Sequence, residues 1–246
     1  MKLSKSKINT FSQCRRRFKY IYIDGLDDGT NKYAQLGLDV HSYAEAIGKE
    51  LKEIENPTKE QILEIAIRLY PYSEDEIDTD EHAQGVIKFF TDVLIVGNYK
   101  IFEVEQYIYD EEHNINGIID IVLQDKDTEE LVIFDYKTGR VKAITDFRLE
   151  LCMYRILMES KYPDCKIVSA GIYFTKDQKY RVFNFAEEQD KGAFVTEQDY
   201  QSVFELIKYV RQQIQDKIFY PKEGAFDYFC NKFCPFKEQC NKDGGF

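Results

Sequence analysis

The segments Gly117-Ile118-Ile119-Asp120 and Asp135-Tyr136-Lys137 decide the fold that is predicted for this chain of 246 residues. Each acid lies in a run dominated by apolar and β-branched residues, which is typical of a strand. The two predicted strands are Ile115 to Val122 and Leu131 to Tyr136. The polar run from Gln124 to Glu130 lies between them and predicts a turn, so the sequence predicts a hairpin.

The register of this hairpin determines where its charged side chains lie. If Gln124 and Leu131 close the turn, Asp120 lies directly opposite Asp135. Lys137 is two residues beyond Asp135 and therefore points to the same face of the sheet. Two carboxylates and an ammonium group then converge, a set that can bind a divalent metal ion and activate water to cut a phosphodiester.

This catalytic interpretation is weighed against a purely structural one. Acids at strand ends beside a lysine are common, so the triplet Asp135-Tyr136-Lys137 is weak on its own. The preceding residues 132–134 predict a buried strand, and charged groups at the end of a buried strand favour a functional site. Gly117, three residues before Asp120, predicts a close approach by another part of the chain.

Composition bounds the class of protein. Apolar residues make up 43% of the chain and aromatic residues 15%, which is ample for the core of one large domain. The chain has no run of about 18 or more apolar residues, so no membrane span is expected. Residues 1–6 lack the apolar core of a signal peptide. A cytoplasmic protein is therefore expected, whose six cysteines are ligands or buried thiols rather than disulfides.

Charge is distributed unevenly along the chain. The formal net charge is −11, yet the first 23 residues hold seven lysines or arginines and no acid. A basic N-terminal face on an acidic body fits a protein that contacts phosphate in one groove, and a solvated basic helix explains the charge equally well. The candidates for DNA binding are Lys5, Lys7, Arg15, Arg16, Arg17 and Lys19.

Periodicity and capping signals predict the remaining elements. One helix is expected from Ser4 to Ile23, capped by Ser6, and another is expected to start at Thr145 or Asp146 and run to about Lys161. The other predicted helices are 36–51, 58–70, 83–97 and 197–218, and the other predicted strands are 99–109, 168–175 and 179–185.

This order of helices, antiparallel strands, crossover helix and further strands predicts one α/β domain over residues 1–246. Its parts are a mainly helical N-terminal layer (1–98), a catalytic sheet core (99–186), and a C-terminal helix with a cysteine-rich tail (197–246).

Four further side chains are candidates for the site. His41 follows Gly37 by one helical turn, and its imidazole suits Mn²⁺ or Mg²⁺, although a lone helical histidine is more often an ordinary surface or core residue. Glu105 is a candidate third carboxylate, with a solvated edge residue about as probable. Glu150 and Tyr154 share one helix face and could hold a phosphate or support Lys137, or they mark the boundary of an ordinary amphipathic helix.

The tail contains three cysteines within eleven residues, which predicts a metal ion or a cluster in a cytosolic protein. Four ligands are usually needed. Cys14 is the candidate fourth ligand, because Cys152 and Cys165 fall in a predicted helix and before a predicted strand. Spacing alone does not separate zinc from iron–sulfur. The predicted ligands are Cys14, Cys230, Cys234 and Cys240.

Together these residues resemble the RecB-like branch of the PD-(D/E)XK nuclease superfamily. Within it they are most similar to the iron–sulfur group of CRISPR-associated RecB-like exonucleases and the AddB nuclease domain. The resemblance spans nearly the whole chain. It rests on the serine-rich start with Cys14, on Gly37 to His41 (G-x-x-x-H), on Gly117 to Asp120 (G-x-x-D), on Asp135 to Thr138 (D-Y-K-T) and on the terminal cysteine triplet.

The resemblance implies a restriction-endonuclease-like core, in which a central mixed sheet is flanked by helices, with a C-terminal cysteine-rich cluster region. It implies that Lys137 orients the attacking water and that the four cysteines hold a structural [4Fe–4S] cluster. The implied metal ligands are His41, Asp120, Asp135 and the carbonyl of Tyr136. The implied catalytic set is Asp120, Asp135, Lys137, Glu105, Glu150 and Tyr154.

Two departures from the family pattern bear on these roles. The family usually has Q-x-x-x-Y where this chain has glutamate at position 150, and a carboxylate accepts hydrogen bonds but cannot donate them. Glu150 is then expected to bind metal or to pair with Lys137 or Arg148. The first two tail cysteines are separated by three residues where the family more often has two, a difference that a loop can absorb.

The leading interpretation is a metal-dependent DNA nuclease, an exonuclease or an end- or flap-processing enzyme that acts on single-stranded DNA or single-stranded ends. The alternatives are a catalytically weak or inactive DNA- or partner-binding module on the same fold, and a structural protein stapled by zinc. The expected cofactors are Mg²⁺ or Mn²⁺ and a [4Fe–4S] cluster, with Zn²⁺ as the alternative at the cysteines. Protein partners in recombination, CRISPR adaptation or phage DNA processing are expected, and no membrane.

Overall fold

The computed structural model describes residues 1–29, 32–73, 76–185, 197–222 and 228–244. These residues form two compact units, a smaller one made of Met1–Asn31 with Gln201–Phe246 and a larger one made of Lys32–Tyr200. The chain leaves the smaller unit once and returns to it once, so the larger unit is one continuous insertion. That both units form a single nuclease domain stays a prediction.

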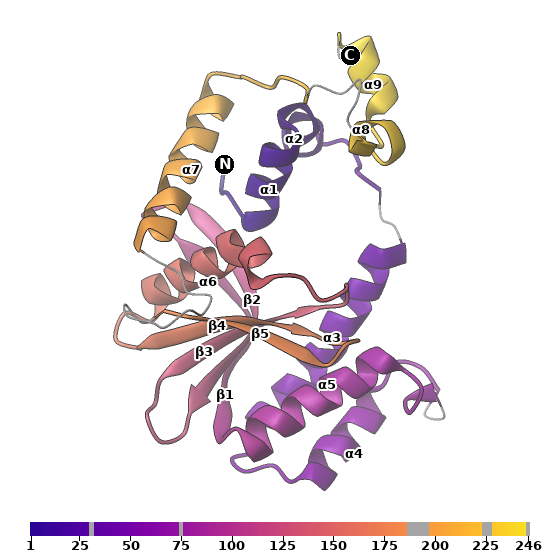
Figure 1. Ribbon diagram of the computed structural model, residues 1–246, viewed down its shortest axis with the longest axis vertical. Coiled ribbons are helices and arrows are strands. Elements are labelled where there is room, and N and C mark those ends of the chain that lie inside the picture. Colours follow the sequence, from indigo (N-terminus) through magenta and orange to yellow (C-terminus); the bar gives the residue numbers. More distant parts are fainter. Residues whose placement is uncertain (30–31, 74–75, 186–196, 223–227, 245–246) are drawn as a thin grey trace. The chain divides into compact units, whose positions relative to one another are not determined.

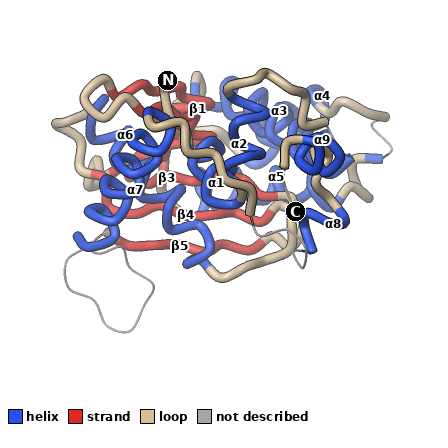
Figure 2. The backbone as a smooth tube through the Cα atoms, turned by 90° about the horizontal axis from the view of Figure 1, so that it is seen from above, coloured by secondary structure: helices blue, strands red, loops and turns tan. Residues whose placement is uncertain are grey.

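A five-stranded sheet forms the centre of the larger unit, with the strands in sequence order across it (Figures 1 and 2). Three neighbouring pairs are antiparallel and one, β3 with β4, is parallel. A parallel pair needs a crossover, which helix α6 (Arg148–Lys161) supplies. The predicted mixed sheet is thereby confirmed. The strands are β1 (Tyr99–Asp110), β2 (Ile115–Asp125), β3 (Leu131–Lys137), β4 (Ile167–Phe174) and β5 (Lys179–Asn184).

The hairpin of β2 and β3 has the predicted register. Its pairs are Gln124–Leu131, Leu123–Val132, Val122–Ile133 and Ile121–Phe134. The ladder ends one step before Asp120 and Asp135. There the Asp120 carboxylate accepts a hydrogen bond of 2.8 Å from the backbone N–H of Tyr136, so a side chain takes the position of the next ladder bond. The end of the hairpin is therefore opened by one of the predicted site residues.

Helices cover both faces of the sheet (Figure 1). Three of them bury their apolar residues against one face in a single hydrophobic cluster, and α6 lies on the opposite face. Six of the seven residues of β3 are consequently buried, which confirms the predicted buried strand. The three helices are α3 (Lys32–Lys52), α4 (Lys59–Leu69) and α5 (Glu81–Thr91).

The first predicted helix is wrong in one respect, because it consists of two helices, α1 (Lys5–Gln13) and α2 (Arg15–Tyr22). Cys14 between them has an extended backbone, and its thiol accepts a hydrogen bond from the N–H of Arg17. The sulfur therefore caps α2 and allows the chain to turn. Ser4, rather than the predicted Ser6, caps α1, since its hydroxyl accepts from the N–H of Lys7.

Two other predicted helices differ at their ends. The fourth helix ends at Thr91 and continues as a π-helical turn, η2 (Asp92–Val96). A 3₁₀ turn, η3 (Ile144–Phe147), precedes α6, so neither Thr145 nor Asp146 caps that helix. The residues predicted as caps instead lie inside the turn.

The smaller unit contains α1, α2, most of α7 (Glu197–Gln215), α8 (Tyr228–Lys232) and α9 (Lys237–Lys242). Aromatic rings hold it together. Phe11 lies edge-on to Phe18 at 5.3 Å and to Tyr209 at 6.4 Å between ring centroids, so the first helices pack on residues that follow the insertion. Across the described residues, no helix has both the length and the apolar character needed to span a membrane.

Candidate functional site

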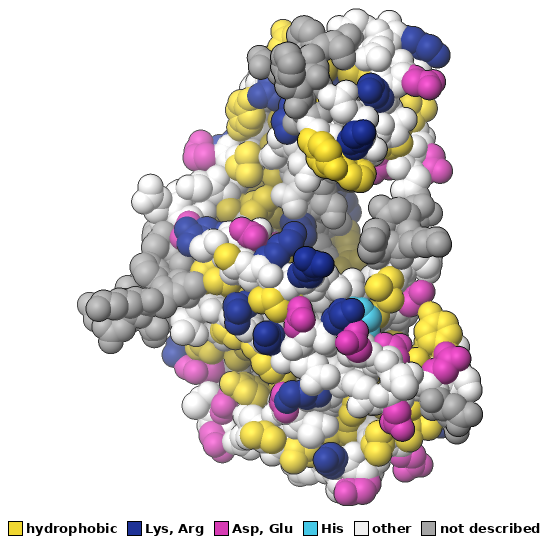
Figure 3. Space-filling model, turned by 45° about the vertical axis from the view of Figure 1, so that its right-hand side comes forward, with side chains coloured by type: hydrophobic (Ala, Val, Ile, Leu, Met, Phe, Trp, Pro, Cys, Tyr) yellow, Lys and Arg dark blue, Asp and Glu magenta, His cyan; other side chains and the backbone are white. Residues whose placement is uncertain are grey.

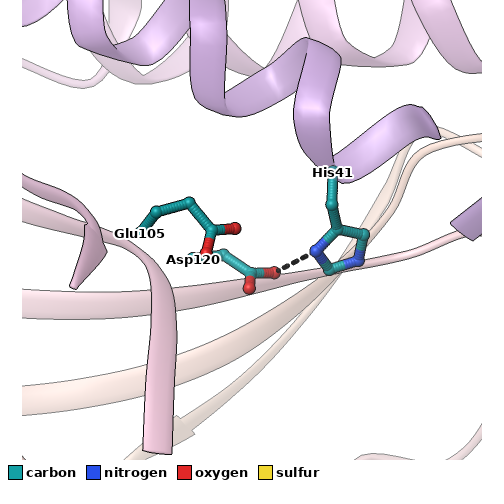
Figure 4. A group of neighbouring side chains, drawn as sticks. All are labelled: His41, Glu105 and Asp120. Carbon is teal, nitrogen blue, oxygen red and sulfur yellow. Dashed lines mark ion pairs between the residues drawn. The ribbon is translucent and has the colours of Figure 1, made fainter. Parts of the chain in front are cut away.

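The site is built where α3 passes the open end of the β2–β3 hairpin. His41 on α3 contacts both strands: its Nε2 lies 2.9 Å from the carbonyl oxygen of Tyr136, and its Nδ1 lies 3.2 Å from Oδ2 of Asp120. The same Asp120 oxygen accepts from the N–H of Tyr136. One imidazole, one carboxylate and one backbone carbonyl are thus held together by direct contacts, of which Figure 4 shows the pair between His41 and Asp120.

Glu105 on β1 completes this group. Ligand atoms of His41, Glu105 and Asp120 all lie within 4.8 Å of one another. The backbone of Glu105 has a φ of 47°, in the left-handed region that residues with a side chain rarely adopt, and the β1–β2 ladder is irregular shortly before it. Strain of this kind persists only where the surroundings enforce it. The bend brings the Glu105 carboxyl group beside Asp120.

The charges of these groups are coupled. Burial, together with the negative charges of Asp120 and Glu45, raises the pKa of Glu105 to about 7. Burial lowers the pKa of His41, but the hydrogen bond and charge of Asp120, helped by Asp135, outweigh it and raise that pKa to about 9. A carbonyl oxygen only accepts hydrogen bonds, so Nε2 carries a hydrogen and donates it to the Tyr136 carbonyl. In the protonated imidazole, Nδ1 also carries a hydrogen and donates it to the Asp120 carboxylate. Without metal, His41 is an imidazolium between two acceptors.

A second group lies beside the first, between β3 and α6. Lys137 forms an ion pair with Oδ2 of Asp135, and its Nζ lies 3.3 Å from Oε1 of Glu150. The hydroxyl of Tyr154 donates to Oδ1 of Asp135 at 2.7 Å and lies 3.3 Å from the same Glu150 oxygen. Asp135 and Glu150 are only 2% and 3% exposed, so this network is held away from water.

The network shows which partner Glu150 has among the three that were predicted for it, a metal ion, Lys137 and Arg148. Glu150 pairs with Lys137, as one of the predicted options states, whereas Arg148 pairs with Asp199 at 2.9 Å. Burial lowers the pKa of Lys137, but the charges of Asp135 and Glu150 outweigh it and raise the pKa above its usual range. Lys137 is therefore a permanent cation at this site. Such a group can donate hydrogen bonds and supply positive charge.

The predicted site residues thus form two adjoining groups. Asp135, predicted as a metal ligand, lies outside the three-residue set, because its oxygens contact Tyr154 and Lys137. Its ligation of metal stays a prediction. The donor set of His41, Glu105, Asp120 and a carbonyl, which is rich in oxygen and contains one nitrogen, fits Mn²⁺ or Mg²⁺.

The two glycines of the motifs have different surroundings. A Cβ at Gly117 would lie 2.7 Å from Cδ1 of Leu157 on α6, so a side chain, rather than backbone, makes the close approach at this position. A Cβ at Gly37 would have ordinary contact, 3.9 Å from the hydroxyl oxygen of Thr138. Position 37 therefore faces the residue after Lys137 without crowding.

Sequence reasoning missed a hydrogen-bonded connection behind Lys137. The backbone N–H of Thr175 donates to the Lys137 carbonyl at 3.0 Å, and the Thr175 hydroxyl lies 2.7 Å from Nδ1 of His82 on α5. A Cβ at Gly85 would lie 1.9 Å from the Thr175 carbonyl oxygen, so glycine is required for this approach. No local motif reveals this contact, since its partners are about 90 residues apart.

Most of the cations predicted to bind DNA make contacts inside the smaller unit. The contacts are Lys7 with the carbonyl of Lys2, Arg15 with Tyr209 and Gln213, Arg16 with the carbonyls of Cys240 and Asp243, Arg17 with Asp28, and Lys19 with Asp24. Arginines 15 and 16 therefore attach α2 to the C-terminal helices. DNA binding by these residues stays a prediction.

The four predicted cluster ligands surround one pocket of the smaller unit. Cys14, Cys230, Cys234 and Cys240 all line it, and all six cysteines of the chain are free thiols. Burial, and then the neighbouring Cys14 and Cys240, raise the pKa of Cys234, although a backbone hydrogen bond and Arg17 oppose this. Within the described residues no three of these sulfurs lie within 4.8 Å of one another.

Three comparisons with known proteins bear on this geometry. The sequence profile of the PD-(D/E)XK nuclease superfamily matches residues 2–241. No curated protein matches the sequence. Among solved structures, a Eubacterium rectale protein provisionally described as an exonuclease is similar, with a TM-score of 0.51 and 10% identity, over 97% of this chain and 87% of that one. At this identity the likeness concerns the fold, and it agrees with the predicted restriction-endonuclease-like core.

Proposed function

Because the chain belongs to the PD-(D/E)XK nuclease superfamily, we propose that it is a divalent-metal-dependent deoxyribonuclease of the RecB-like iron–sulfur branch. One observation carries the proposal: His41, Asp120, Glu105 and the carbonyl of Tyr136 converge beside the buried Lys137 network. A structural protein has no evident need for seven charged or polar side chains at a strained sheet end.

The residues divide the chemistry between them. His41, Asp120, Glu105 and the Tyr136 carbonyl would hold the metal, with Asp135 as a further ligand. Mg²⁺ or Mn²⁺ bound there would lower the pKa of a water molecule and neutralise charge that develops on the phosphate. Lys137, as a permanent cation, orients that water and the phosphate through its hydrogen bonds.

The second group fixes Lys137 in place. Its Nζ is shared between Asp135 and Glu150, and Tyr154 keeps these two carboxylates together by its hydroxyl. Two buried carboxylates alone would repel each other, so the ammonium and the hydroxyl are both needed. Glu150 and Tyr154 are therefore positioning residues in this proposal. We expect substrates with single-stranded DNA or single-stranded ends.

Cleavage of labelled DNA by single variants tests the catalytic proposal. Lys137→Ala and Asp120→Asn should each reduce Mn²⁺-dependent cleavage by at least about 100-fold, since the first removes positive charge at the reacting phosphate and the second weakens the site that would hold the metal. Lys88→Ala is the matched control, because it removes an exposed lysine paired with Asp92 on η2. Wild-type cleavage by Lys137→Ala or Asp120→Asn would overturn the assignment. Loss in Lys88→Ala would show that the assay reports folding.

We also propose that the cysteine pocket holds a [4Fe–4S] cluster. Four zinc-bound thiolates are drawn to sulfur separations of about 3.8 Å, as follows from Zn–S bonds of about 2.3 Å, whereas a cube of four irons spaces its thiolates more widely. The four cysteines Cys14, Cys230, Cys234 and Cys240 line one pocket, which supplies the four thiolates that such a cluster needs. Bound there, the cluster would join the first helices to the tail.

Anaerobic purification followed by metal analysis and absorption spectroscopy tests the cluster. A broad visible band with about four irons per chain is expected, and Cys234→Ser should lose both. Cys152→Ser is the control, because Cys152 is buried in α6 within the larger unit. A colourless protein with one zinc per chain would replace the cluster by zinc and leave the catalytic proposal intact.

A further inference from the structure

Four exposed cations surround the end of the sheet at which Lys137 lies. Arg140 and Lys142 are in the loop from β3 to α6, three and five residues after Lys137, and Lys179 and Arg181 are on β5. We refer to these four residues as the basic rim. Figure 3 shows lysine and arginine side chains gathered near a histidine on the face of the molecule drawn there.

The strand register places the rim beside the site. Lys137 pairs with Phe174 and Phe174 with Lys179, so Lys179 lies two strands away, at about 10 Å between Cα atoms. Asp135 reaches Arg181 in the same way through Ile172. Side chains in such a row point to one face of the sheet.

The length of the loop limits how far its two cations can lie from Lys137. Consecutive Cα atoms are 3.8 Å apart, so Arg140 lies within about 11 Å of Lys137 and Lys142 within about 19 Å. The loop is anchored, because the N–H of Val141 donates to Oδ2 of Asp177 at 3.3 Å and Ile144 is buried. Its charged residues are thus presented from a fixed backbone.

The rim differs from other cations of the chain in its partners. None of its four residues forms an ion pair or a hydrogen bond to a carboxylate among the described residues, although the net charge of the chain is −11. By contrast, many exposed lysines and arginines elsewhere are paired. Examples are Lys49 with Glu45, Arg68 with Glu50, Lys166 with Glu130 and Lys176 with Glu81.

Unpaired cations held close together repel one another, and the charge of Arg140 reaches Lys176 as well. An arrangement of this kind is relieved by a ligand with regularly spaced negative charges. The phosphate backbone of a nucleic acid has that property, and each phosphate contact adds affinity through the release of counterions. The predicted cations of α1 and α2 are mostly occupied by their own chain, whereas the rim is not.

We propose that the basic rim, Arg140, Lys142, Lys179 and Arg181, binds phosphates of the DNA strand that adjoin the phosphate at which the strand is cut. This inference rests on the proposed nuclease function in taking DNA as the ligand. The rim positions the strand and does not take part in bond cleavage. Its loss should weaken binding equally for all base sequences.

Binding of a fluorescein-labelled single-stranded oligonucleotide, measured by anisotropy from 50 to 300 mM KCl with Ca²⁺ in place of Mn²⁺, tests the rim. Two double variants are compared with the wild type, Arg140→Ala with Lys142→Ala and Lys179→Ala with Arg181→Ala. Each removes two contacts, so the slope of log affinity against log salt should fall by about 1.4 and affinity by about 25-fold near 0.1 M salt.

Two control variants distinguish the loss of positive charge at the rim from the loss of positive charge elsewhere on the sheet. Lys100→Ala with Lys126→Ala removes two cations near the opposite end of the strands, since Lys100 pairs with Gln124 at the start of the hairpin turn, and it should leave the slope unchanged. Arg140→Lys with Lys142→Arg keeps both charges and should retain affinity. With Mn²⁺, the alanine variants should raise KM and leave kcat unchanged.

The outcomes separate this inference from the proposed function. A wild type that binds DNA with the expected dependence on the rim but cuts nothing would refute the nuclease proposal and support the rim. A wild type that cuts DNA while both rim variants keep its slope and affinity would overturn the rim. Failure of the wild type to bind the oligonucleotide, or an equal loss in the Lys100 and Lys126 control, would also overturn it.

Discussion

The hydroxyl of Tyr154 offers the sharpest test of the buried network. In Tyr154→Phe one oxygen atom is removed from a side chain that is 7% exposed, and ring packing is kept. The lost hydrogen bond, 2.7 Å to Oδ1 of Asp135, has a charged acceptor. Burial, and then the charges of Asp135, Glu150 and Asp120, raise the pKa of Tyr154 well above its usual range, so the hydroxyl is a donor at all working pH values.

The expected loss follows from the charge of the acceptor. Removing a hydrogen bond to a charged group costs about 1.5–3 kcal/mol, and a neutral one about 0.5–1.5 kcal/mol. Tyr173→Phe is the matched control, because that hydroxyl is fully buried and donates to the Gly85 carbonyl at 2.9 Å. We therefore expect Tyr154→Phe to lower the free energy of unfolding by about 2 kcal/mol and Tyr173→Phe by about 1 kcal/mol.

Urea denaturation followed by circular dichroism measures both values, since the chain contains no tryptophan. Cleavage should separate the variants further. Tyr154→Phe lets Asp135 and Glu150 move apart and displaces Lys137, so kcat should fall, whereas Tyr173→Phe should keep wild-type kcat. Equal losses of stability, or an effect of Tyr154→Phe below about 0.5 kcal/mol, would refute the reasoning that a charged acceptor is held there.

Four further predictions concern three separate features, His41, Gly85 and Glu150. Mn²⁺ binding at pH 8 should release about one proton from His41, because its pKa of about 9 keeps it charged, and isothermal titration in buffers of different ionisation enthalpy measures this release. Without metal, the stability that protonated His41 contributes should be fully present below about pH 6.5 and lost as pH rises through about 9. Gly85→Ala should lower the melting temperature strongly, because its Cβ meets the Thr175 carbonyl, whereas Gly139→Ala, with open space around it, should not. Glu150→Gln should keep cleavage within about tenfold, because the amide oxygen can still accept from Lys137, whereas Glu150→Leu should lose about 3 kcal/mol of stability as well as activity.

For each of these three features, one experimental result would contradict the prediction. Proton release of about one proton that persists in His41→Ala would assign the titration to another group. Equal melting temperatures for the two glycine variants would show that the approach of Thr175 is looser than described. Wild-type activity in Glu150→Leu would remove Glu150 from the support of Lys137.

The sequence predicted the β2–β3 hairpin well because two local signals agree there. Apolar residues fill both strands, and the polar run between them limits the turn to one place. The register then follows, and with it the approach of Asp120 to the strand that carries Asp135. Motifs in the sequence also made His41 and the four cysteines candidate ligands, since metal-ligand residue types at fixed spacing are visible without any structure.

Other parts depend on contacts between distant segments and were not visible. The left-handed backbone of Glu105 arises from the irregular β1–β2 ladder, and nothing in the residues around it predicts a positive φ. The break at Cys14 was missed because cysteine is not among the usual helix caps. Arg15, Arg16 and Arg17 showed their charge in the sequence, but two of them find partners about 200 residues away.

The continuous insertion of residues 32–200 sets an order of events during synthesis. When Tyr200 has been made, every strand of the sheet is present, and domains commonly fold in that order as the chain emerges. At that point only Cys14 of the four pocket cysteines has been made, because the other three follow at positions 230, 234 and 240. A chain interrupted before Cys230 can carry every strand of the sheet but only one of the four thiols that line the pocket.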